Sequence, residues 1–124
     1  MLIVDDEPDL LAFLDRALRS RFDVTQRADG FSAAQTLAEQ PFDLIVTDHR
    51  MPGFDGVELL ERIRDQYSTM ARLLLTGYDD SEEVSRIVNN GWVDLCLAKP
   101  VDLSQLMSAI DQAIKARKTR LADQ

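Results

Sequence analysis

The sequence predicts an α/β domain in which a parallel β-sheet is covered by helices on both faces. Five short strand-like segments alternate along the chain with five segments of helical periodicity, the pattern of repeated strand–helix units. Residues 2–4, 44–47 and 72–76 are nearly continuous apolar runs, which is typical of strands buried on both faces. A length of 124 residues fits one domain with one core.

The first half of the chain contains a boundary signal for each predicted element. Pro8 follows the strand at residues 2–4 and suits the first turn of a helix, where no N–H donor is needed. A polar strand at residues 23–26 suits a sheet edge, and residues 29–30 (Asp-Gly) break the chain before a second helix that Pro41 ends. Helical spacing marks apolar faces at Leu10, Leu14, Ala17 and Leu18 in the first helix, and at Phe31, Ala34 and Ala38 in the second.

The third and fourth helices carry start and stop signals of the same kind. Residues 51–53 (Met-Pro-Gly) predict a loop, and Asp55 with Glu58 is typical of a capping box. Asp80 with Glu83 opens the fourth helix, for which residues 90–91 (Asn-Gly) suit the C-terminal cap. Their apolar stripes are Val57, Leu60 and Ile63 in the third helix, and Val84, Ile87 and Val88 in the fourth.

The last strand and helix lead into a cationic segment. Residues 95–97 predict the fifth strand, and the following helix has a strong apolar stripe at Leu103, Leu106, Met107, Ile110 and Ile114. The cations of residues 115–120 fit either a helix end that complements its dipole or a linker to an output domain. We therefore expect a domain at residues 1–114, with 115–124 as the helix end or the start of a linker.

Composition and charge exclude several classes of protein. The chain is 45% hydrophobic and 29% charged, as in soluble globular proteins. With 22 acidic and 14 basic residues its net charge is −8, which argues against direct nucleic-acid binding. The single cysteine, Cys96, cannot form an internal disulfide and fits a reducing compartment. Because no membrane-spanning run or signal peptide is recognisable, we expect a cytoplasmic location and no membrane partner.

Polar residues follow four of the predicted strands at their carboxyl ends. They are Asp5 with Asp6, Asp48, Thr76 and Lys99. Each alone has an ordinary structural explanation, as a helix cap, a β-former or a solvated cation. Because the carboxyl ends of parallel strands meet at the edge where α/β proteins bind ligands, we expect all of them to share one site.

The residue types at this edge indicate phosphoryl chemistry with a divalent cation. Neighbouring carboxylates raise one another's pKa unless a cation compensates their charge. Mg²⁺ suits a site with few carboxylates and an incoming phosphate. A carboxylate is also a competent nucleophile toward phosphorus. Lys99 and Thr76 supply donors for the oxygens of a phosphoryl group in transfer.

Four motifs stand at the predicted strand ends: IVDDEP at residues 3–8, TDHRMPGFDG at 47–56, LTGY at 75–78 and AKP at 98–100. Together they resemble the receiver domain of two-component response regulators. Their order and spacing match the family, and the resemblance covers essentially the whole chain. It implies a single, doubly wound (βα)5 domain of the flavodoxin-like type with strand order 2-1-3-4-5, and a phosphorylation-dependent signalling switch.

The resemblance also implies how the phosphoryl group and the metal are bound. Asp48 would be the phosphoacceptor, taking its phosphoryl group from a histidine kinase. Mg²⁺, or Mn²⁺ in its place, would be bound directly by Asp6 and largely through water by Asp5. Asp48 and the backbone carbonyl of Arg50 would complete the protein ligands.

Further positions would control the switch and the lifetime of the phosphorylated state. The resemblance implies that Thr76 binds a phosphoryl oxygen and moves on activation, that Lys99 pairs with Asp48 or its phosphate, and that the peptide bond before Pro100 is cis. Cys96 stands where receivers commonly carry Tyr or Phe, which puts the aromatic version of the switch in doubt.

Five further residues have reactive, charged or aromatic side chains and are interpreted as follows. We hypothesise that Arg50 and Tyr78 tune the lifetime of the acyl phosphate through water access and charge. His49, the only histidine, is interpreted as a solvated loop side chain and Trp92 as a loop anchor. Cys96 is expected to pack as a small hydrophobe.

The implied partners are a sensor histidine kinase or a phosphotransfer protein. The resemblance leaves open a C-terminal output domain and a homodimer through the fourth helix, fifth strand and fifth helix. No enzymatic activity is expected beyond the chain's own phosphorylation and dephosphorylation. The polar residues of the expected partner face are Glu82, Glu83, Ser85, Arg86, Gln105, Ser108, Asp111 and Gln112.

Three other functions remain as alternatives. A hydrolase of the haloacid-dehalogenase type would need a second Asp two residues after its nucleophile, where this chain has Arg50. A degenerate receiver used only for docking would lack an acidic, Thr or Lys position, and none is lacking. A flavin-binding domain would need a phosphate-binding loop where residues 5–7 (Asp-Asp-Glu) repel phosphate.

Overall fold

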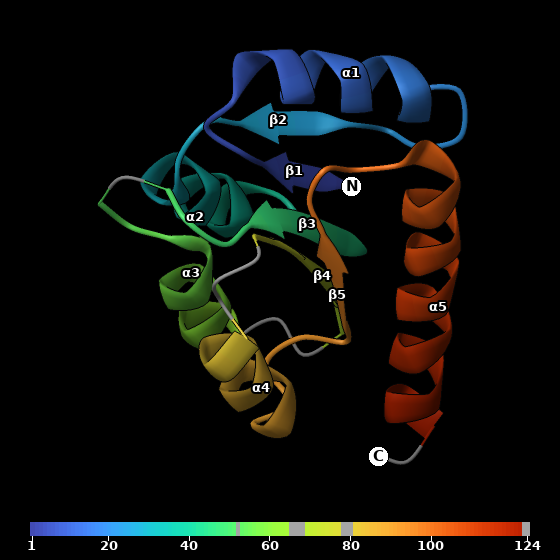
Figure 1. Ribbon diagram of the computed structural model, residues 1–124. Helices are drawn as coiled ribbons and strands as arrows, with labels where there is room; N and C mark the ends of the chain where they lie inside the picture. The colour runs from blue at the N-terminus through green and yellow to red at the C-terminus, as the bar shows by residue number, and fades with distance from the viewer. Residues whose placement is uncertain (52, 65–68, 78–80, 123–124) are drawn as a thin grey trace.

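Strands and helices alternate throughout the chain (Figure 1). The computed structural model describes residues 1–51, 53–64, 69–77 and 81–122. Its elements are β1 Leu2–Val4, α1 Pro8–Leu18, β2 Thr25–Arg27, α2 Gly30–Glu39, β3 Leu44–Asp48, α3 Gly56–Ile63, β4 Ala71–Thr76, α4 Ser81–Asn89, β5 Leu95–Ala98 and α5 Leu103–Ala122. The predicted alternation of five strands and five helices is confirmed.

The five strands form one parallel sheet in the order β2-β1-β3-β4-β5. This confirms the order that the resemblance implied. In the register of the sheet, Asp48 lies opposite Leu75, and Thr76 lies opposite Ala98. The carboxyl ends of β3, β4 and β5 therefore lie side by side at one edge of the sheet.

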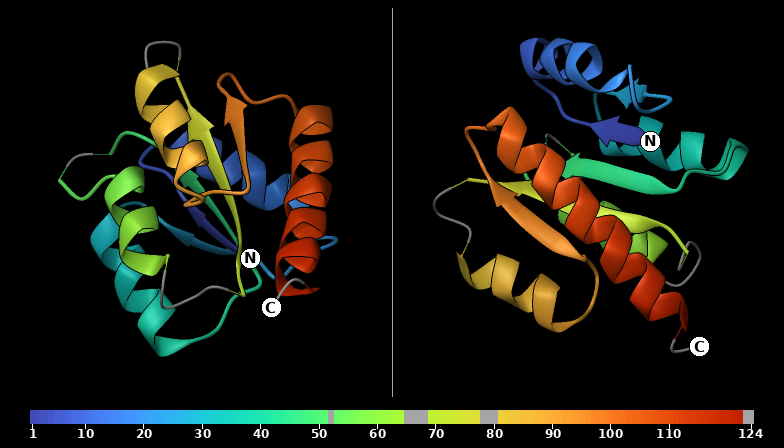
Figure 2. Two further views of the ribbon diagram at one scale, coloured as in Figure 1. Left: turned by 90° about the horizontal axis from the view of Figure 1, so that it is seen from below. Right: turned by 90° about the vertical axis from the view of Figure 1, so that its right-hand side faces the viewer.

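Helices cover both faces of the sheet (Figure 2). On one face, α1 and α5 pack against alternate strand residues that include Ile3, Val46 and Leu75. On the other, α2, α3 and α4 pack against the intervening residues, among them Val4 and Ile45. Two apolar layers thus enclose the sheet, as a doubly wound fold requires.

Strand burial follows the predicted order of centre and edge. Every residue of β1, β3 and β4 is buried, whereas all three residues of β2 are half-buried. The polar strand expected at residues 23–26 begins two residues later, at Thr25. It lies at the edge of the sheet, as predicted, beside β1 alone.

The predicted helix boundaries rest on observed caps. Pro8 begins α1, and the capping box of Asp55 and Glu58 begins α3. After α4, Gly91 has a φ of +72°, and its N–H donates to the carbonyl of Val88 while that of Trp92 donates to the carbonyl of Ile87. These two bonds form the left-handed C-terminal cap that the Asn-Gly pair predicts.

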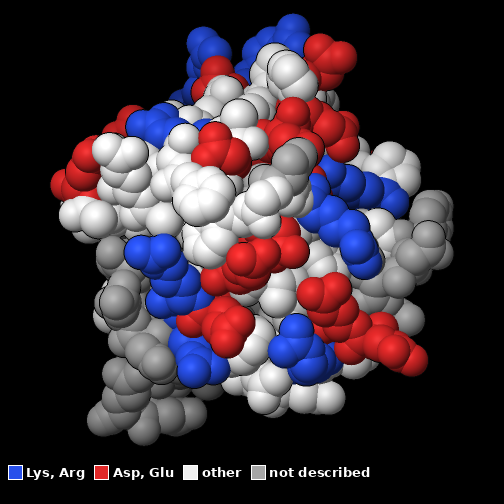
Figure 3. Space-filling view, turned by 90° about the vertical axis from the view of Figure 1, so that its left-hand side faces the viewer, with Lys and Arg blue, Asp and Glu red and all other residues white. Residues whose placement is uncertain are grey.

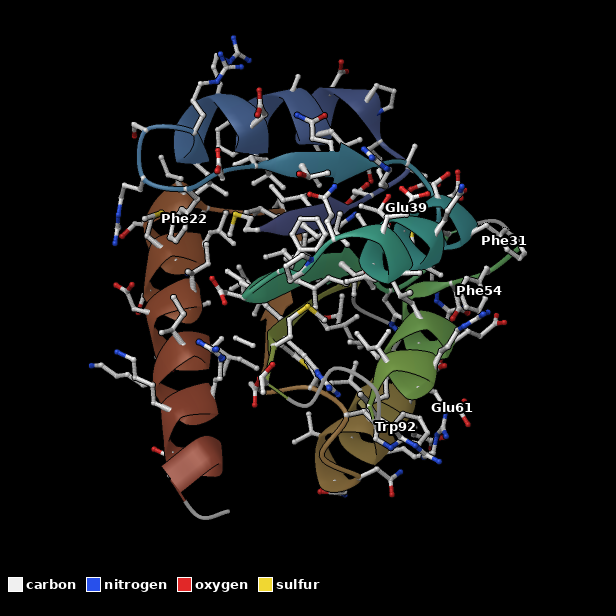
Figure 4. All side chains as sticks on the ribbon, turned by 180° about the vertical axis from the view of Figure 1, so that it is seen from behind. Phe22, Phe31, Glu39, Phe54, Glu61 and Trp92 are labelled. Atoms are coloured by element: carbon white, nitrogen blue, oxygen red, sulfur yellow. The ribbon has the colours of Figure 1, made fainter. Side chains whose placement is uncertain are left out.

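The buried face of α2 differs from the prediction. Phe31 is 65% exposed and Ala38 is exposed, whereas Ala33, Thr36 and Leu37 are buried. Phe31 instead stacks on Phe54, with ring centroids 5.1 Å apart, at the rim of the molecule (Figure 4). Val88 and Leu103 are also exposed, by 48% and 39%, which contradicts their assignment to the buried apolar stripes of α4 and α5.

The last helix continues past the expected domain boundary. It ends at Ala122, so the cations of residues 115–120 lie within α5. Arg117 still packs on the domain, donating through Nε to the carbonyl of Thr69 and lying 3.8 Å from the carboxylate of Asp43. None of the helices in the described part of the chain, α5 included, is both long and apolar enough to cross a membrane.

Candidate functional site

Three carboxylates gather at the carboxyl edge of the sheet. Asp5 follows β1, Asp6 is the next residue, and Asp48 ends β3. One carboxylate oxygen from each lies within 4.8 Å of the others. Asp5 and Asp48 are buried, whereas Asp6 is exposed. On this side of the molecule, acidic side chains cluster with lysines and arginines around them (Figure 3).

The alternation of side chains along the strands explains why these groups meet. Ile3, Val46 and Leu97 pack under α1 and α5. The residues two positions further along each strand are Asp5, Asp48 and Lys99. Because residues two apart in a strand share a face, three apolar rows each end in an ionisable group at the same edge.

Lys99 is the cation at the centre of this cluster. Its Nζ lies 3.1 Å from a carboxylate oxygen of Asp5, 3.1 Å from one of Asp48 and 3.2 Å from one of Glu7. The backbone N–H of Lys99 donates to the carbonyl of Thr76 at 2.8 Å. The ammonium therefore bridges the ends of β1 and β3 from a backbone anchored to the end of β4.

Glu7 was not singled out as a site residue by the sequence analysis. Its N–H donates to Asp5 Oδ1 at 2.9 Å, which turns the chain so that the Glu7 side chain also reaches Lys99. The available signal was its place two residues after Asp5 in the acidic run.

Burial raises the pKa of both buried carboxyl groups. The pKa of Asp48 rises to about 6, first because of burial and then because of the negative charges of Asp5 and Asp6, although Lys99 acts in the opposite direction. Burial also raises the pKa of Asp5, opposed by the hydrogen bond from Glu7 and by Lys99. Both acids are thus easier to protonate than ordinary aspartic acids.

Lys99 is held firmly in its charged form. Burial lowers the pKa of its ammonium, but hydrogen bonding and charge attraction from Asp5 and Asp48 more than offset this, so that the net pKa is raised. One cation therefore faces several carboxylates, and the cluster keeps an excess of negative charge.

The cluster fits a hard divalent cation. Asp5 Oδ2 is buried, and its partner within the described part of the chain is the ammonium of Lys99, 3.1 Å away. Carboxylate oxygens in this number are the ligands that Mg²⁺ prefers. A depression of about 320 Å³ opens over them, lined by Asp6, Glu7, Asp48, His49, Arg50, Gly77 and Lys99.

The backbone around Asp48 is tightly constrained. The N–H of His49 donates to the carbonyl of Leu75 at 2.9 Å, and its carbonyl accepts from Gly56 at 2.9 Å. A Cβ atom on Gly56 would lie 2.0 Å from the carbonyl oxygen of Asp48. Glycine is therefore required where α3 begins, and the start of α3 packs directly against the backbone of Asp48.

The remaining predicted site residues lie at or near the same edge. Thr76 ends β4 and is 7% exposed. Arg50 borders the depression, with its side chain 69% exposed and a guanidinium nitrogen 3.9 Å from a carboxylate oxygen of Glu83. The Lys99–Pro100 peptide bond is cis. Tyr78 lies outside the described residues.

The interpretation of His49 as a solvated side chain is wrong. His49 is 2% exposed, and its Nε2 lies 3.1 Å from Oε2 of Glu83 on α4. It follows Asp48 directly, so its side chain points to the opposite face of the sheet. A loop assignment missed this because the hydrogen bonding between β3 and β4 continues one residue past β3, where the N–H of His49 donates to the carbonyl of Leu75.

Cys96 and Trp92 pack as expected. Cys96 lies opposite Leu74 in the sheet and packs against the core, and burial raises the pKa of its thiol to about 11. Trp92 is 8% exposed within the same apolar cluster. Neither residue contributes to the acidic site.

The comparisons with known proteins identify one protein family. The family model "Response regulator receiver domain" matches residues 1–111. The chain is 33% identical over 117 residues to the hydrogenase transcriptional regulatory protein HoxA of Cupriavidus necator, covering 94% of this chain and 24% of that protein. It is also 33% identical over 117 residues to the response regulator protein PilR of Pseudomonas aeruginosa, covering 94% and 26%. The chain thus spans about a quarter of the length of these relatives.

A solved structure has the same fold as this chain. The crystal structure described as an adenylate cyclase from Rhodopirellula baltica is 34% identical to this chain, with a TM-score of 0.91. The match covers 98% of this chain and 91% of that one.

Proposed function

The chain belongs to the family of response regulator receiver domains, and on that basis we propose that it is a switch whose phosphoacceptor is Asp48. Membership implies phosphorylation-dependent signalling; the identity of the acceptor is our proposal. The observation that supports it best is the position of Lys99 Nζ, 3.1 Å from carboxylate oxygens of both Asp5 and Asp48. A nucleophile, its acidic neighbours and a cation are thereby assembled at one sheet edge.

The proposed transfer starts from a phosphohistidine of a sensor kinase or a phosphotransfer protein. A carboxylate oxygen of Asp48 attacks phosphorus, the P–N bond breaks, and the imidazole nitrogen leaves with the electron pair. Lys99 then donates to a phosphoryl oxygen, and Thr76 supplies a hydroxyl donor from the end of β4.

Asp5, Asp6, Asp48 and the carbonyl of Arg50 would hold Mg²⁺ or Mn²⁺. When bound, the ion would supply positive charge for the phosphoryl oxygens and relieve the repulsion among the carboxylates. The buried Oδ2 of Asp5 and the clustering of three carboxylates support this ligand set. Asp5 contributes by orienting the cluster through its hydrogen bond from Glu7 and its ion pair with Lys99.

Arg50 and Tyr78 are proposed to set how fast the acyl phosphate hydrolyses. Arg50 borders the depression over Asp48, and we propose that its guanidinium pairs with a phosphoryl oxygen there. Tyr78 carries the bulk that would limit the access of water. The chain's own chemistry is thus limited to accepting and losing one phosphoryl group.

The output surface is proposed to be the face formed by α4, β5 and α5. Its exposed polar residues include Glu82, Ser85, Arg86, Gln105, Ser108, Asp111 and Gln112. A shallow groove of about 380 Å³ runs between β5 and α5. A second copy of the chain, or an output domain joined after a receiver unit at residues 1–114, is the proposed partner of this face. We propose that the signalling takes place in the cytoplasm.

Incubation with acetyl phosphate and Mg²⁺, followed by intact mass spectrometry, tests the phosphoacceptor. The wild-type chain should gain one phosphoryl group and Asp48→Asn none. The matched control is Asp43→Asn, because the Asp43 side chain is 94% exposed and its carboxylate has only a loose ion pair, 3.8 Å from a guanidinium nitrogen of Arg117. This variant should gain one phosphoryl group, as the wild type does. Equal labelling of Asp48→Asn, or no labelling of the wild type, would contradict the proposal.

A further inference from the structure

The residue after Asp48 connects the acidic site to α4. His49 is fixed on both sides by its backbone, through Leu75 and Gly56, each at 2.9 Å. Its buried side chain crosses to the face of the sheet that α4 covers, and Nε2 lies 3.1 Å from Oε2 of Glu83. Asp48 and His49 share one peptide unit, so a movement of the backbone at one is a movement of the other.

Glu83 lies in the first turn of α4, where it faces three cationic or donor groups. Besides His49, a guanidinium nitrogen of Arg50 is 3.9 Å from Oε2, and one of Arg86 is 4.0 Å from Oε1. The contact with His49 alone is at normal hydrogen-bonding distance. The other two are at the outer limit of an ion pair, so the imidazole is the closest described attachment of Glu83.

The other end of α4 is attached to α3 through Trp92. The guanidinium groups of Arg64 and Arg86 lie 5.3 Å and 5.4 Å from the centre of the Trp92 ring. Figure 4 shows Trp92 where α4 meets α3. Arg86 thus contacts both Glu83 and Trp92, and Trp92 is the only tryptophan of the chain. The ring is therefore a natural reporter of the position of α4.

We propose that Glu83 is a positioning residue that couples the state of Asp48 to the position of α4 through His49. The inference rests on the proposed function, because it needs Asp48 to change state. The proposed route runs from Asp48 through the peptide unit that it shares with His49, and then through the imidazole to Glu83 and the first turn of α4. Coupling of this kind is reciprocal between the two places.

Three variants test the coupling. Glu83→Ala removes the carboxylate that lies 3.1 Å from Nε2 of His49. Glu83→Gln keeps an oxygen that can accept from Nε2 while removing the charge. Glu82→Ala is the matched control, because Glu82 is the preceding, exposed glutamate on the same helix turn. Each is first compared with the wild type by thermal unfolding and by intact mass after treatment with acetyl phosphate and Mg²⁺. The readouts are Trp92 fluorescence and amide hydrogen exchange over residues 81–92, with and without phosphorylation.

Phosphorylation should change both readouts in the wild type and in Glu82→Ala. In Glu83→Ala, with the same degree of phosphorylation, both changes should fall at least threefold, and Glu83→Gln should retain more than half of them. A merely structural role for Glu83 would lower the stability of Glu83→Ala without reducing the change on phosphorylation.

Two results would overturn the coupling while leaving the proposed function intact. One is a phosphorylated wild type with neither readout changed. The other is a phosphorylated Glu83→Ala that responds as fully as Glu82→Ala. Failure of the wild type to accept a phosphoryl group at all would instead contradict the proposed function, and the coupling with it.

Discussion

Asp48 is subject to opposing influences that leave its charge dependent on pH. Burial and the charges of Asp5 and Asp6 favour the neutral acid, and Lys99 favours the carboxylate, with the pKa settling at about 6. The ordinary value in an unfolded chain is near 4. The folded protein therefore binds this proton more tightly than the unfolded chain does, and the stability that the group contributes below pH 4 is lost as pH rises through 6.

Asp48→Asn should therefore stabilise the metal-free protein at neutral pH. The asparagine mimics the neutral acid, so we expect its free energy of unfolding at pH 8 to exceed that of the wild type by about 1–3 kcal/mol. The difference should disappear below about pH 3, where Asp48 is protonated in both the folded and the unfolded chain. Urea unfolding in the presence of a chelator, followed by circular dichroism across this range, measures it.

Glu61→Gln is the control for that experiment. Glu61 is an exposed acid on α3, and the same change of charge there should alter stability by less than about 0.5 kcal/mol at every pH. A pH-independent gain in Asp48→Asn would mean that burial does not control the charge of Asp48.

At the level of elements, Arg72 shows how a strand residue can cap the C-terminal end of a helix. It lies in β4 and is 4% exposed, and its guanidinium donates to the carbonyls of Ile63 and Arg64 at 3.2 Å and 3.3 Å. Those carbonyls lie at the C-terminal end of α3, where the helix itself provides no donors. Its backbone N–H donates to Asp94 at 2.9 Å, which joins β4 to the segment before β5.

Arg72→Met should destabilise the fold by about 1–3 kcal/mol. The methionine roughly preserves the volume of the side chain, but it removes the guanidinium that donates to the buried carbonyl of Ile63, and a buried acceptor that loses its donor costs about 1–3 kcal/mol. The free energy of unfolding in urea measures the effect.

Arg16→Met, an exposed change in the last turn of α1, serves as its control and should cost less than about 0.5 kcal/mol. A loss of similar size in both variants would show that Arg72 acts only through its charge.

The elements also show which local patterns can be interpreted without the fold. Pro8, the Asp55–Glu58 capping box and Gly91 each act through their own neighbours in the chain, so the boundaries that they predict are observed. The inner face of α2 depends on where the helix is placed against α3 and the sheet. Phe31 looks like a core residue by hydrophobicity, yet its partner is Phe54 on a distant loop.

For the whole molecule, the acidic site predicts a linkage between metal binding and stability. The repulsion among Asp5, Asp6 and Asp48 opposes folding, and a cation bound only by the folded state opposes unfolding. A concentration of Mg²⁺ 100 times its Kd should add about 2.7 kcal/mol. This corresponds to roughly 4 °C in Tm for each kcal/mol.

Thermal unfolding in Mg²⁺ and in a chelator measures this linkage. Asp6→Asn should lose most of the gain in Tm, because it removes one carboxylate of the cluster. Asp6 is exposed, so its substitution leaves the core unchanged. Glu61→Gln should retain the gain. Equal shifts in all three proteins would show that the ion acts through general screening rather than at the carboxylate cluster.

The sequence by itself determined the alternation of strands and helices, the central and edge strands, and the convergence of acidic residues and a lysine at one sheet edge. These features follow from the spacing of apolar residues and from the polar residues at the carboxyl ends of strands, which are both local properties of the sequence. Only the tertiary structure decided that Lys99 also reaches Glu7, that His49 is buried against Glu83, and which side of α2 faces inward. Each of these depends on how far apart two separate segments lie, a distance that spacing along one chain does not specify.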